Sequence, residues 1–188
     1  MAQRRGTRVK NLSDALVEDA CPLCSVLKDF QTCHLNELDR HEVDRLCGFH
    51  VWMVAKLADA RSAAAVFLRI IARPFPQESP ISACDACERI AQEERTRVKE
   101  FAASLNNPQF MRWLRDHGAL CLPHAQKILS EVPKTAQSDI VLALSRRRSE
   151  LTQKLTELLR QAGDKLPTQP GVLGRAAEYL VAQRGLRS

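Results

Sequence analysis

The sequence predicts an all-α fold: a multi-helix array of two tandem CxxC…CxxH modules with a C-terminal helical extension. Three observations lead to this prediction. No segment of five or more residues alternates cleanly between apolar and polar side chains, as a half-buried strand would. Glycine accounts for only 7 of 188 residues and aromatic residues for 5%, which disfavours a β-sandwich or barrel. Apolar residues instead recur at helical spacing between recognisable start and stop signals.

The first module is expected to contain two helices. One begins at Cys21-Pro22-Leu23-Cys24, because proline fits the first turn of a helix, and runs to about Leu38. The other is a single long helix from Phe49 to Ile71, where apolar and small residues dominate. Three prolines between Arg73 and Pro80 cannot continue a helix and mark a module boundary.

The second module is expected to contain four helices. The first starts near Cys84 and runs to about Leu105. Asn107-Pro108 then reads as an N-cap followed by proline in the first turn, which opens a short helix that Gly118 ends. The remaining expected helices cover Pro123 to about Val132 and Thr135 to Ala162, the latter stopped by Gly163. A tail helix is expected from Gly174 to Gln183.

These signals divide the chain into four parts. We expect a disordered basic arm at 1–10, a first metal-binding module at 11–76, a second at 77–166, and a tail at 167–188. Trp52 and Trp113 are expected in the core, covering the metals. On the long helix, the apolar spacing predicts either core packing or a homodimer seam, and the sequence does not choose the oligomeric state. The leucines concerned are Leu155, Leu158 and Leu159.

An internal repeat carries the chemistry. Each copy is a CxxC motif followed at a distance by LCxxH, with 22 residues between Cys24 and Cys47 and 33 between Cys87 and Cys121. Six of the seven cysteines belong to the repeat, and only Cys33 is left over. Two close pairs of soft or borderline ligands are what tetrahedral Zn²⁺ requires.

The repeat predicts one metal site in each module, formed by a CxxC and the CxxH that follows it. The predicted ligands of the first site are Cys21, Cys24, Cys47 and His50, and those of the second are Cys84, Cys87, Cys121 and His124. Each pair lies at an expected helix start, where the helix dipole and unpaired N–H groups stabilise thiolates. Two structural zinc ions per chain follow, with no open coordination position for hydrolysis.

The arrangement CPLC…LCGFH, followed by CDAC…NNPQFMRWLRDHGALCLPHAQKIL, resembles a family of uncharacterised, mostly helical prokaryotic proteins with repeated CPxC…GxCxxH units. The segment from Asn107 to Leu114, with Gly118 after it, matches an Asx-Pro-x-[FL]-x-x-x-[LF] pattern of that family. The resemblance covers roughly residues 18–130 and implies a helical metal-binding protein without an established activity. The second CxxC lacks the proline, the first spacer is shorter, and Gly48 follows Cys47 instead of preceding it.

Two other readings of the cysteines involve redox or catalytic chemistry. The same ligands could hold an iron–sulfur cluster of an electron-transfer or redox protein, although the identical mixed Cys₃His set at both sites favours zinc. A thiol oxidoreductase would normally carry its CxxC after a strand, and none is expected here. A nucleophile made of Cys33 with His34 or His117 is also conceivable, but adjacent helical residues point about 100° apart, so Cys33 and His34 are poorly placed for each other. An enzyme is not expected.

The charge pattern leaves a nucleic-acid partner as a further alternative. The net charge is +6, and two basic clusters could contact phosphates. They are Arg4, Arg5, Arg8 and Lys10 in the arm, and Arg146, Arg147 and Arg148 on the long helix. No basic stripe interleaved with aromatics and no helix-turn-helix pattern supports base recognition, so a protein partner is the stronger expectation.

The sequence gives no membrane signal. Asp14, Glu18 and Asp19 interrupt any apolar segment that a signal peptide would need, and no run approaches 18 uncharged apolar residues. We therefore expect a cytoplasmic protein with no membrane contact, in which the thiols stay reduced and are available to metals.

Overall fold

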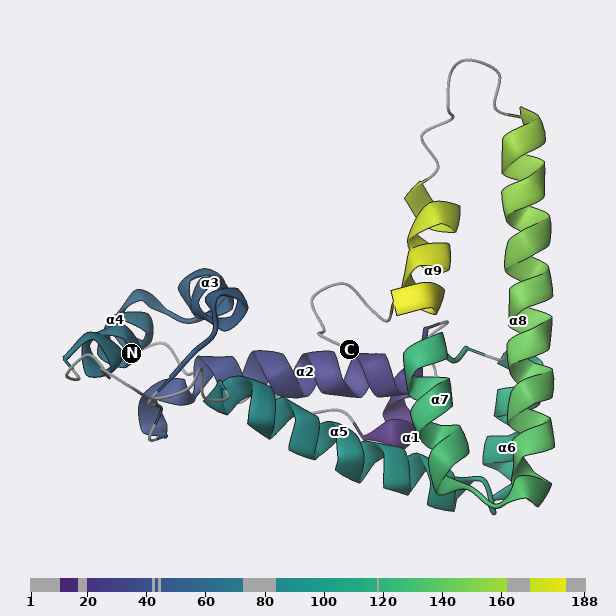
Figure 1. Ribbon diagram of the computed structural model, residues 1–188, viewed down its shortest axis with the longest axis horizontal. Helices are drawn as coiled ribbons and strands as arrows, with labels where there is room; N and C mark the ends of the chain where they lie inside the picture. Colours follow the sequence, from purple (N-terminus) through teal and green to yellow (C-terminus); the bar gives the residue numbers. More distant parts are fainter. Residues whose placement is uncertain are drawn as a thin grey trace, which may run out of the picture. The chain divides into compact units, whose positions relative to one another are not determined.

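The computed structural model describes residues 11–16, 20–41, 43, 45–72, 84–117, 119–161 and 170–181. Over these residues the chain forms nine α-helices and one 3₁₀ helix, with no strand (Figure 1). The predicted all-α fold is confirmed. The expectations for the arm at 1–10, the segment at 73–80, and the stops at Gly118 and Gly163 lie outside the described residues.

The described chain divides into two compact units. Residues 27–95 form one, which we call the central unit, and residues 11–26 with 96–181 form the other, which we call the terminal unit. Both divisions fall inside a helix: one in α2 (Pro22–Asn36) and one in α5 (Asp85–Ser104). The units therefore differ from the two consecutive modules expected at 11–76 and 77–166, because each unit takes residues from both.

The central unit contains the later part of α2, the 3₁₀ helix η1 (Leu38–Arg40), α3 (Gly48–Leu57), α4 (Ala60–Ile71) and the start of α5. Its core is built from short apolar side chains and one cysteine. The fully buried members are Leu35, Leu38, Val43, Val54, Ala63, Val66, Cys84 and Ala86. A ligand cysteine therefore belongs to the hydrophobic core itself.

The single helix expected from Phe49 to Ile71 is in fact two helices. Ala58 has an extended backbone (φ −75°, ψ 151°), and Asp59 caps α4 by accepting a 3.0 Å hydrogen bond from the Ser62 N–H. An aspartate in this position satisfies one of the unpaired N–H groups of a helix start. The apolar composition of the segment obscured this cap in the sequence.

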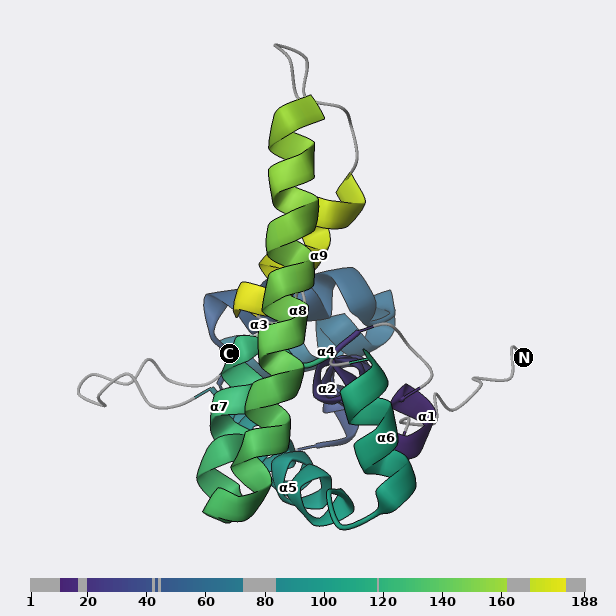
Figure 2. The ribbon, with the colours of Figure 1, turned by 90° about the vertical axis from the view of Figure 1, so that its right-hand side faces the viewer.

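The terminal unit is built around α8 (Lys134–Gln161), which packs against α6 (Pro108–His117), α7 (Leu122–Glu131) and α9 (Pro170–Val181) (Figures 1 and 2). The short helix α1 (Leu12–Ala15) and parts of α2 and α5 complete the unit. The largest buried side chains of the unit come from α2, α5, α6, α7, α8 and the segment before α7. They include Leu23, Phe101, Leu114, Leu120, Ile128 and Ile140.

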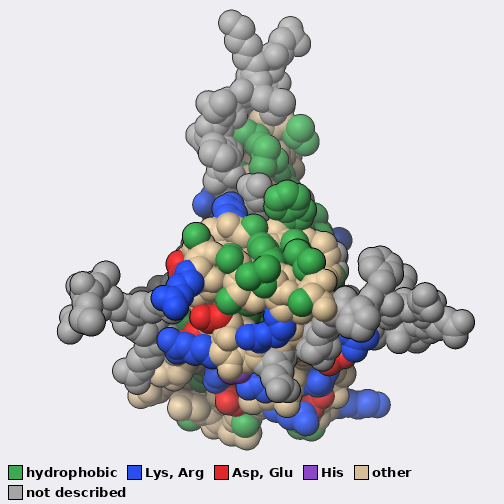
Figure 3. Space-filling view, turned by 90° about the vertical axis from the view of Figure 1, so that its left-hand side faces the viewer, with side chains coloured by type: hydrophobic (Ala, Val, Ile, Leu, Met, Phe, Trp, Pro, Cys, Tyr) green, Lys and Arg blue, Asp and Glu red, His purple; other side chains and the backbone are tan. Residues whose placement is uncertain are grey.

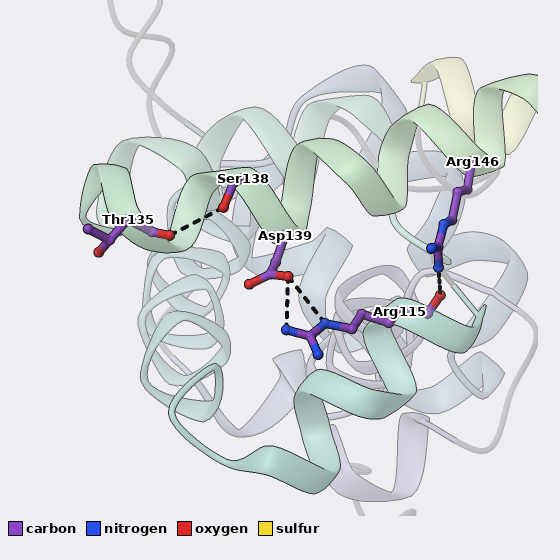
Figure 4. A network of polar contacts seen from close by, with 5 residues as sticks. All are labelled: Arg115, Thr135, Ser138, Asp139 and Arg146. Carbon is purple, nitrogen blue, oxygen red and sulfur yellow. Dashed lines mark hydrogen bonds and ion pairs between the residues drawn. The ribbon is translucent and has the colours of Figure 1, made fainter.

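A polar network fastens α6 to α8 (Figure 4). The Arg115 guanidinium donates to one Asp139 carboxylate oxygen from Nε and Nη2, at 3.2 and 3.0 Å. Arg146 in turn donates to the Arg115 carbonyl at 3.0 Å. At the other end of α6, the Asn107 side chain accepts from the Gln109 N–H at 2.9 Å, which confirms the predicted N-cap.

The expectation for the tryptophans is wrong in one case. Trp52 is 77% exposed and so is not a core residue, whereas Trp113 is half-buried beside Phe110. On α8, Leu158 is buried, Leu155 is half-buried and Leu159 is 75% exposed. None of the described helices is both long and apolar enough to cross a lipid bilayer.

Candidate metal centres

All eight predicted ligands gather in two groups of four. The terminal group consists of Cys21, Cys24, Cys121 and His124, and the central group of Cys47, His50, Cys84 and Cys87. Within each group, one ligand atom from each residue lies within 4.8 Å of the other three. Each group belongs wholly to the unit whose name it shares.

The predicted pairing of the motifs is wrong. The CxxC of the first copy meets the CxxH of the second, and the CxxC of the second meets the CxxH of the first, so that the pairing is nested. Helix length explains the difference, because α2 carries the chain about 22 Å away from its own CxxC. Only ten residues then separate Asn36 from Cys47, and Val43 among them is held in the central core. This segment does not return the chain to Cys21.

The same argument applies to the second copy. The 20 residues of α5 span about 30 Å, which separates Cys84 and Cys87 from the residues that follow this helix. Because a long helix follows each CxxC, the CxxC lies beside the CxxH of the other copy and not beside its own.

Every ligand pair lies at the start of a helix, as predicted. Cys47 and Cys121 are N-caps with extended backbones, and Cys21 and Cys84 directly precede α2 and α5. Each of these four carbonyls accepts the first hydrogen bond of its helix, at 2.9–3.1 Å. The second ligand of each pair is the third residue of the helix, so both side chains lie beside the same unpaired N–H groups and the positive end of the helix dipole.

The distances within the terminal group fit a single tetrahedral ion. The Cys24 and Cys121 sulfurs are 3.7 Å apart. Nδ1 of His124 lies 3.5, 3.3 and 3.1 Å from the sulfurs of Cys21, Cys24 and Cys121, respectively. Zinc bonds of about 2.3 Å to sulfur and about 2.0–2.1 Å to nitrogen, in a tetrahedron, imply separations of about 3.8 Å between sulfurs and about 3.5 Å between sulfur and nitrogen.

The central group has the same dimensions. The sulfurs of Cys47 and Cys87 are 3.8 Å apart. Nδ1 of His50 lies 3.4 Å from the Cys47 sulfur, 3.4 Å from that of Cys84 and 3.3 Å from that of Cys87. In both groups Nδ1 is therefore the histidine atom that faces the sulfurs.

The pKa values of the thiols favour a cation bound in each group. Hydrogen bonds to Cys121 and Cys21, together with burial, raise the pKa of Cys24 far above its usual value. Burial also raises the pKa of Cys21, but hydrogen bonds with Cys121, Cys24 and His124 outweigh it and hold that pKa well below the usual value. In the central group, burial and the neighbours Cys84 and Cys47 raise the pKa of Cys87 to about 12. A divalent cation would supply the positive charge that lets all three sulfurs ionise.

The other predicted candidates do not assemble into a site. Cys33 belongs to neither group. His34 stacks on Phe30 with ring centroids 5.8 Å apart, and burial, with His41 and Arg89, lowers its pKa to about 4. His41 and His117 are exposed.

The three arginines on α8 do not form one exposed patch. Arg147 is buried and pairs with Glu150 at 3.2 Å, while Arg146 and Arg148 are exposed. The basic residues predicted for the arm lie outside the described residues.

No family model, curated protein or solved structure matches this chain.

Proposed function

We propose that the protein binds two structural zinc ions, one in each group, and acts as a non-enzymatic scaffold for a protein partner. The observation that carries the proposal is the dimension of the groups: all four ligand atoms of each lie within 4.8 Å of one another. Three thiolates and one imidazole in a tetrahedron are the donor set and geometry that zinc favours.

The same dimensions favour a single ion over an iron–sulfur cluster. In a cluster, the protein ligands are distributed over several iron atoms, so they lie farther apart than ligands that share one ion. The sulfur separations of 3.7 and 3.8 Å match a shared ion.

A structural role fits the coordination and the burial. Four protein ligands leave no position for a substrate or a reactive water. Each ion would join the starts of two helices: α2 to α7 in the terminal group and α3 to α5 in the central group. Structural zinc contributes on the order of 10 kcal/mol to the folding of small domains, enough to decide whether a unit of this size folds.

Exposed apolar side chains support the scaffold part of the proposal. Figure 3 shows hydrophobic side chains gathered on one face, bordered by Lys and Arg. In the central unit, Trp52 and Ile71 are each 77% exposed and Leu68 is 68% exposed, on α3 and α4. Such patches are typical of protein interaction sites, and tryptophan is a frequent binding hot spot.

Elemental analysis of protein purified without oxygen tests the metal assignment. We expect two zinc ions per chain and a colourless solution. Iron and inorganic sulfide in a brown preparation would instead support the cluster. Trp52→Ala should leave the zinc content unchanged, because Trp52 is not a ligand. It should weaken capture of a protein partner, because it removes an exposed apolar side chain from the proposed interaction face.

A further inference from the structure

A small cavity lies beside the terminal group. The ligands Cys21, Cys24 and Cys121 line part of its wall, and side chains from α8 and α9 line another part. Its volume of about 20 Å³ can hold one water molecule and no larger ligand. The side chains across the cavity are therefore close neighbours of the sulfurs.

Two arginines and one carboxylate face this cavity from α8 and α9. Arg147 is 9% exposed and Arg175 is half-buried, and Glu178 lines the same cavity. Arg147 has an ion-pair partner in Glu150. The Nε atom of Arg175, by contrast, is buried and has no hydrogen-bond partner among the residues that the structure describes. A buried guanidinium N–H without an acceptor costs free energy, so the Nε atom of Arg175 requires a hydrogen-bond acceptor beside it.

A loaded terminal group would supply what Arg175 lacks. Distances of 3.1–3.7 Å join the three sulfurs and Nδ1 of His124. When an ion takes over the ligand atoms, the sulfurs carry no proton and become acceptors for nearby N–H groups. Zn²⁺ with three thiolates and a neutral imidazole has a net charge of −1, and a buried charge needs an opposite charge beside it.

We propose that Arg147 and Arg175 are the counter-cations of the zinc-loaded terminal group, and that Arg175 thereby couples zinc loading to the docking of α9. Glu150 already compensates much of the charge of Arg147, so Arg175, whose Nε has no described partner, is the arginine of this wall most available to balance the −1 of the loaded group. The inference rests on the proposed zinc sites and makes the docking of α9 depend on zinc in the terminal group.

The packing of α9 makes such an anchor important. Three of its large apolar side chains, Leu173, Leu180 and Val181, are between 52% and 62% exposed. Hydrophobic packing of α9 against its neighbours therefore depends mainly on the half-buried Val172, Ala176 and Tyr179. A charge-assisted hydrogen bond from the half-buried Arg175 would contribute a correspondingly larger share.

The test compares the full chain with two variants by hydrogen exchange and mass spectrometry. Arg175→Met keeps the aliphatic stem and removes the donors, and the control Arg160→Met changes an exposed arginine of α8 that lines neither this cavity nor the groove beside α9. In the zinc-loaded Arg175→Met protein we expect the α9 amides to exchange roughly tenfold faster, as for the loss of one charge-assisted hydrogen bond. One of the two zinc ions should also pass faster to a chelator. The Arg160→Met protein should behave as the parent.

Zinc removal from the parent gives the second arm. We expect α9 of the metal-free parent to exchange at least as fast as in zinc-loaded Arg175→Met, because losing the ion also destabilises the terminal unit. In metal-free protein, Arg175→Met should add no further acceleration, since Arg175 then has no thiolate to bind. The coupling is overturned if α9 exchange is unchanged by Arg175→Met in protein that carries two zinc ions, or is unchanged by removing zinc from the parent. A parent that binds no zinc would overturn the proposed function itself, so the two failures are distinguishable.

Discussion

The terminal and central groups use the same four donors and the same position at helix starts, yet their surroundings differ. All four ligands of the terminal group are buried, whereas Cys47 and Cys87 of the central group are half-buried. The terminal ligand pairs lie 97–103 residues apart in the chain and the central ones 34–40. From this difference we expect the two groups to favour the same metal, because their donors are the same, and to release it at different rates, because their burial differs.

Removing one ligand of the terminal group should have the largest effect and should separate the behaviour of the two groups. Cys121→Ser should abolish zinc binding in the terminal group and destabilise the terminal unit by several kcal/mol, up to the order of 10 kcal/mol, because a structural ion is lost. We expect the zinc content to fall from two to one per chain and hydrogen exchange to accelerate in α6, α7 and α8, with α3 and α4 still protected. Cys33→Ser is the matched control and should keep both ions. Retention of two ions by Cys121→Ser would show that a ligand is misassigned.

A chelator challenge tests the difference in burial directly. The central ion should leave first, since Cys47 and Cys87 are partly open to solvent and can exchange their bonds to the metal. The measurement is the time course of zinc release from the parent, beside Cys87→Ser, which should lack the faster phase. Loss of the slower phase in Cys87→Ser would reverse the assignment.

Acid sensitivity should distinguish the units through one histidine. Burial, followed by His41 and Arg89, lowers the pKa of His34 to about 4, below the unfolded value of about 6.5. Neutral His34 therefore contributes stability above pH 6.5 that is lost as the pH falls from about 6.5 towards 4. The full shift corresponds to about 3 kcal/mol, and solvent screening of the half-buried ring makes the effect smaller, so His34→Leu should remove less than about 3 kcal/mol of pH dependence from the free energy of unfolding. The exposed His117→Leu is the control, and equal pH profiles for the parent and His34→Leu would contradict the prediction.

The helix caps offer the smallest and best matched test. Asp59 caps α4 in the central unit and Asn107 caps α6 in the terminal unit, each through its side-chain oxygen. Replacing either with alanine should cost about 1 kcal/mol of unfolding free energy. Asp59→Ala should cost more, because Asp59 also accepts from the Ser62 hydroxyl at 3.0 Å. Chemical denaturation of both variants measures the difference.

The sequence allowed the helices and the ligands to be predicted because both depend on local signals. Pro22, Pro108 and Pro123 mark helix starts, and each ligand pair is three residues apart, so neither prediction needs knowledge of the distant chain. The pairing of the motifs depends on where two rigid helices deliver the chain, which spacing does not encode. A repeat suggests separate modules, whereas α2 and α5 each belong to both units.

Two smaller errors have the same origin. The apolar run after Phe49 suggested one helix, although Asp59 with Ser62 three residues later is a recognisable cap. The hydrophobicity of Trp52 suggested burial, but the faces that a helix presents to its neighbours are set by tertiary packing. Likewise, Arg147 was predicted to belong to a basic cluster that could contact phosphates, but it is buried beside the terminal group.

The nested pairing has a consequence for biosynthesis. Cys24 leaves the ribosome 97 residues before Cys121, which at about 5–20 residues per second is a wait of roughly 5–20 s. Throughout that interval the nascent chain carries half of a metal site, while both halves of the other emerge within 40 residues of each other. The ligands of the central group are therefore complete first. A polypeptide that ends before Cys121 keeps Cys21 and Cys24 without their partner ligands, so these two thiols can react with oxidants or bind another metal ion.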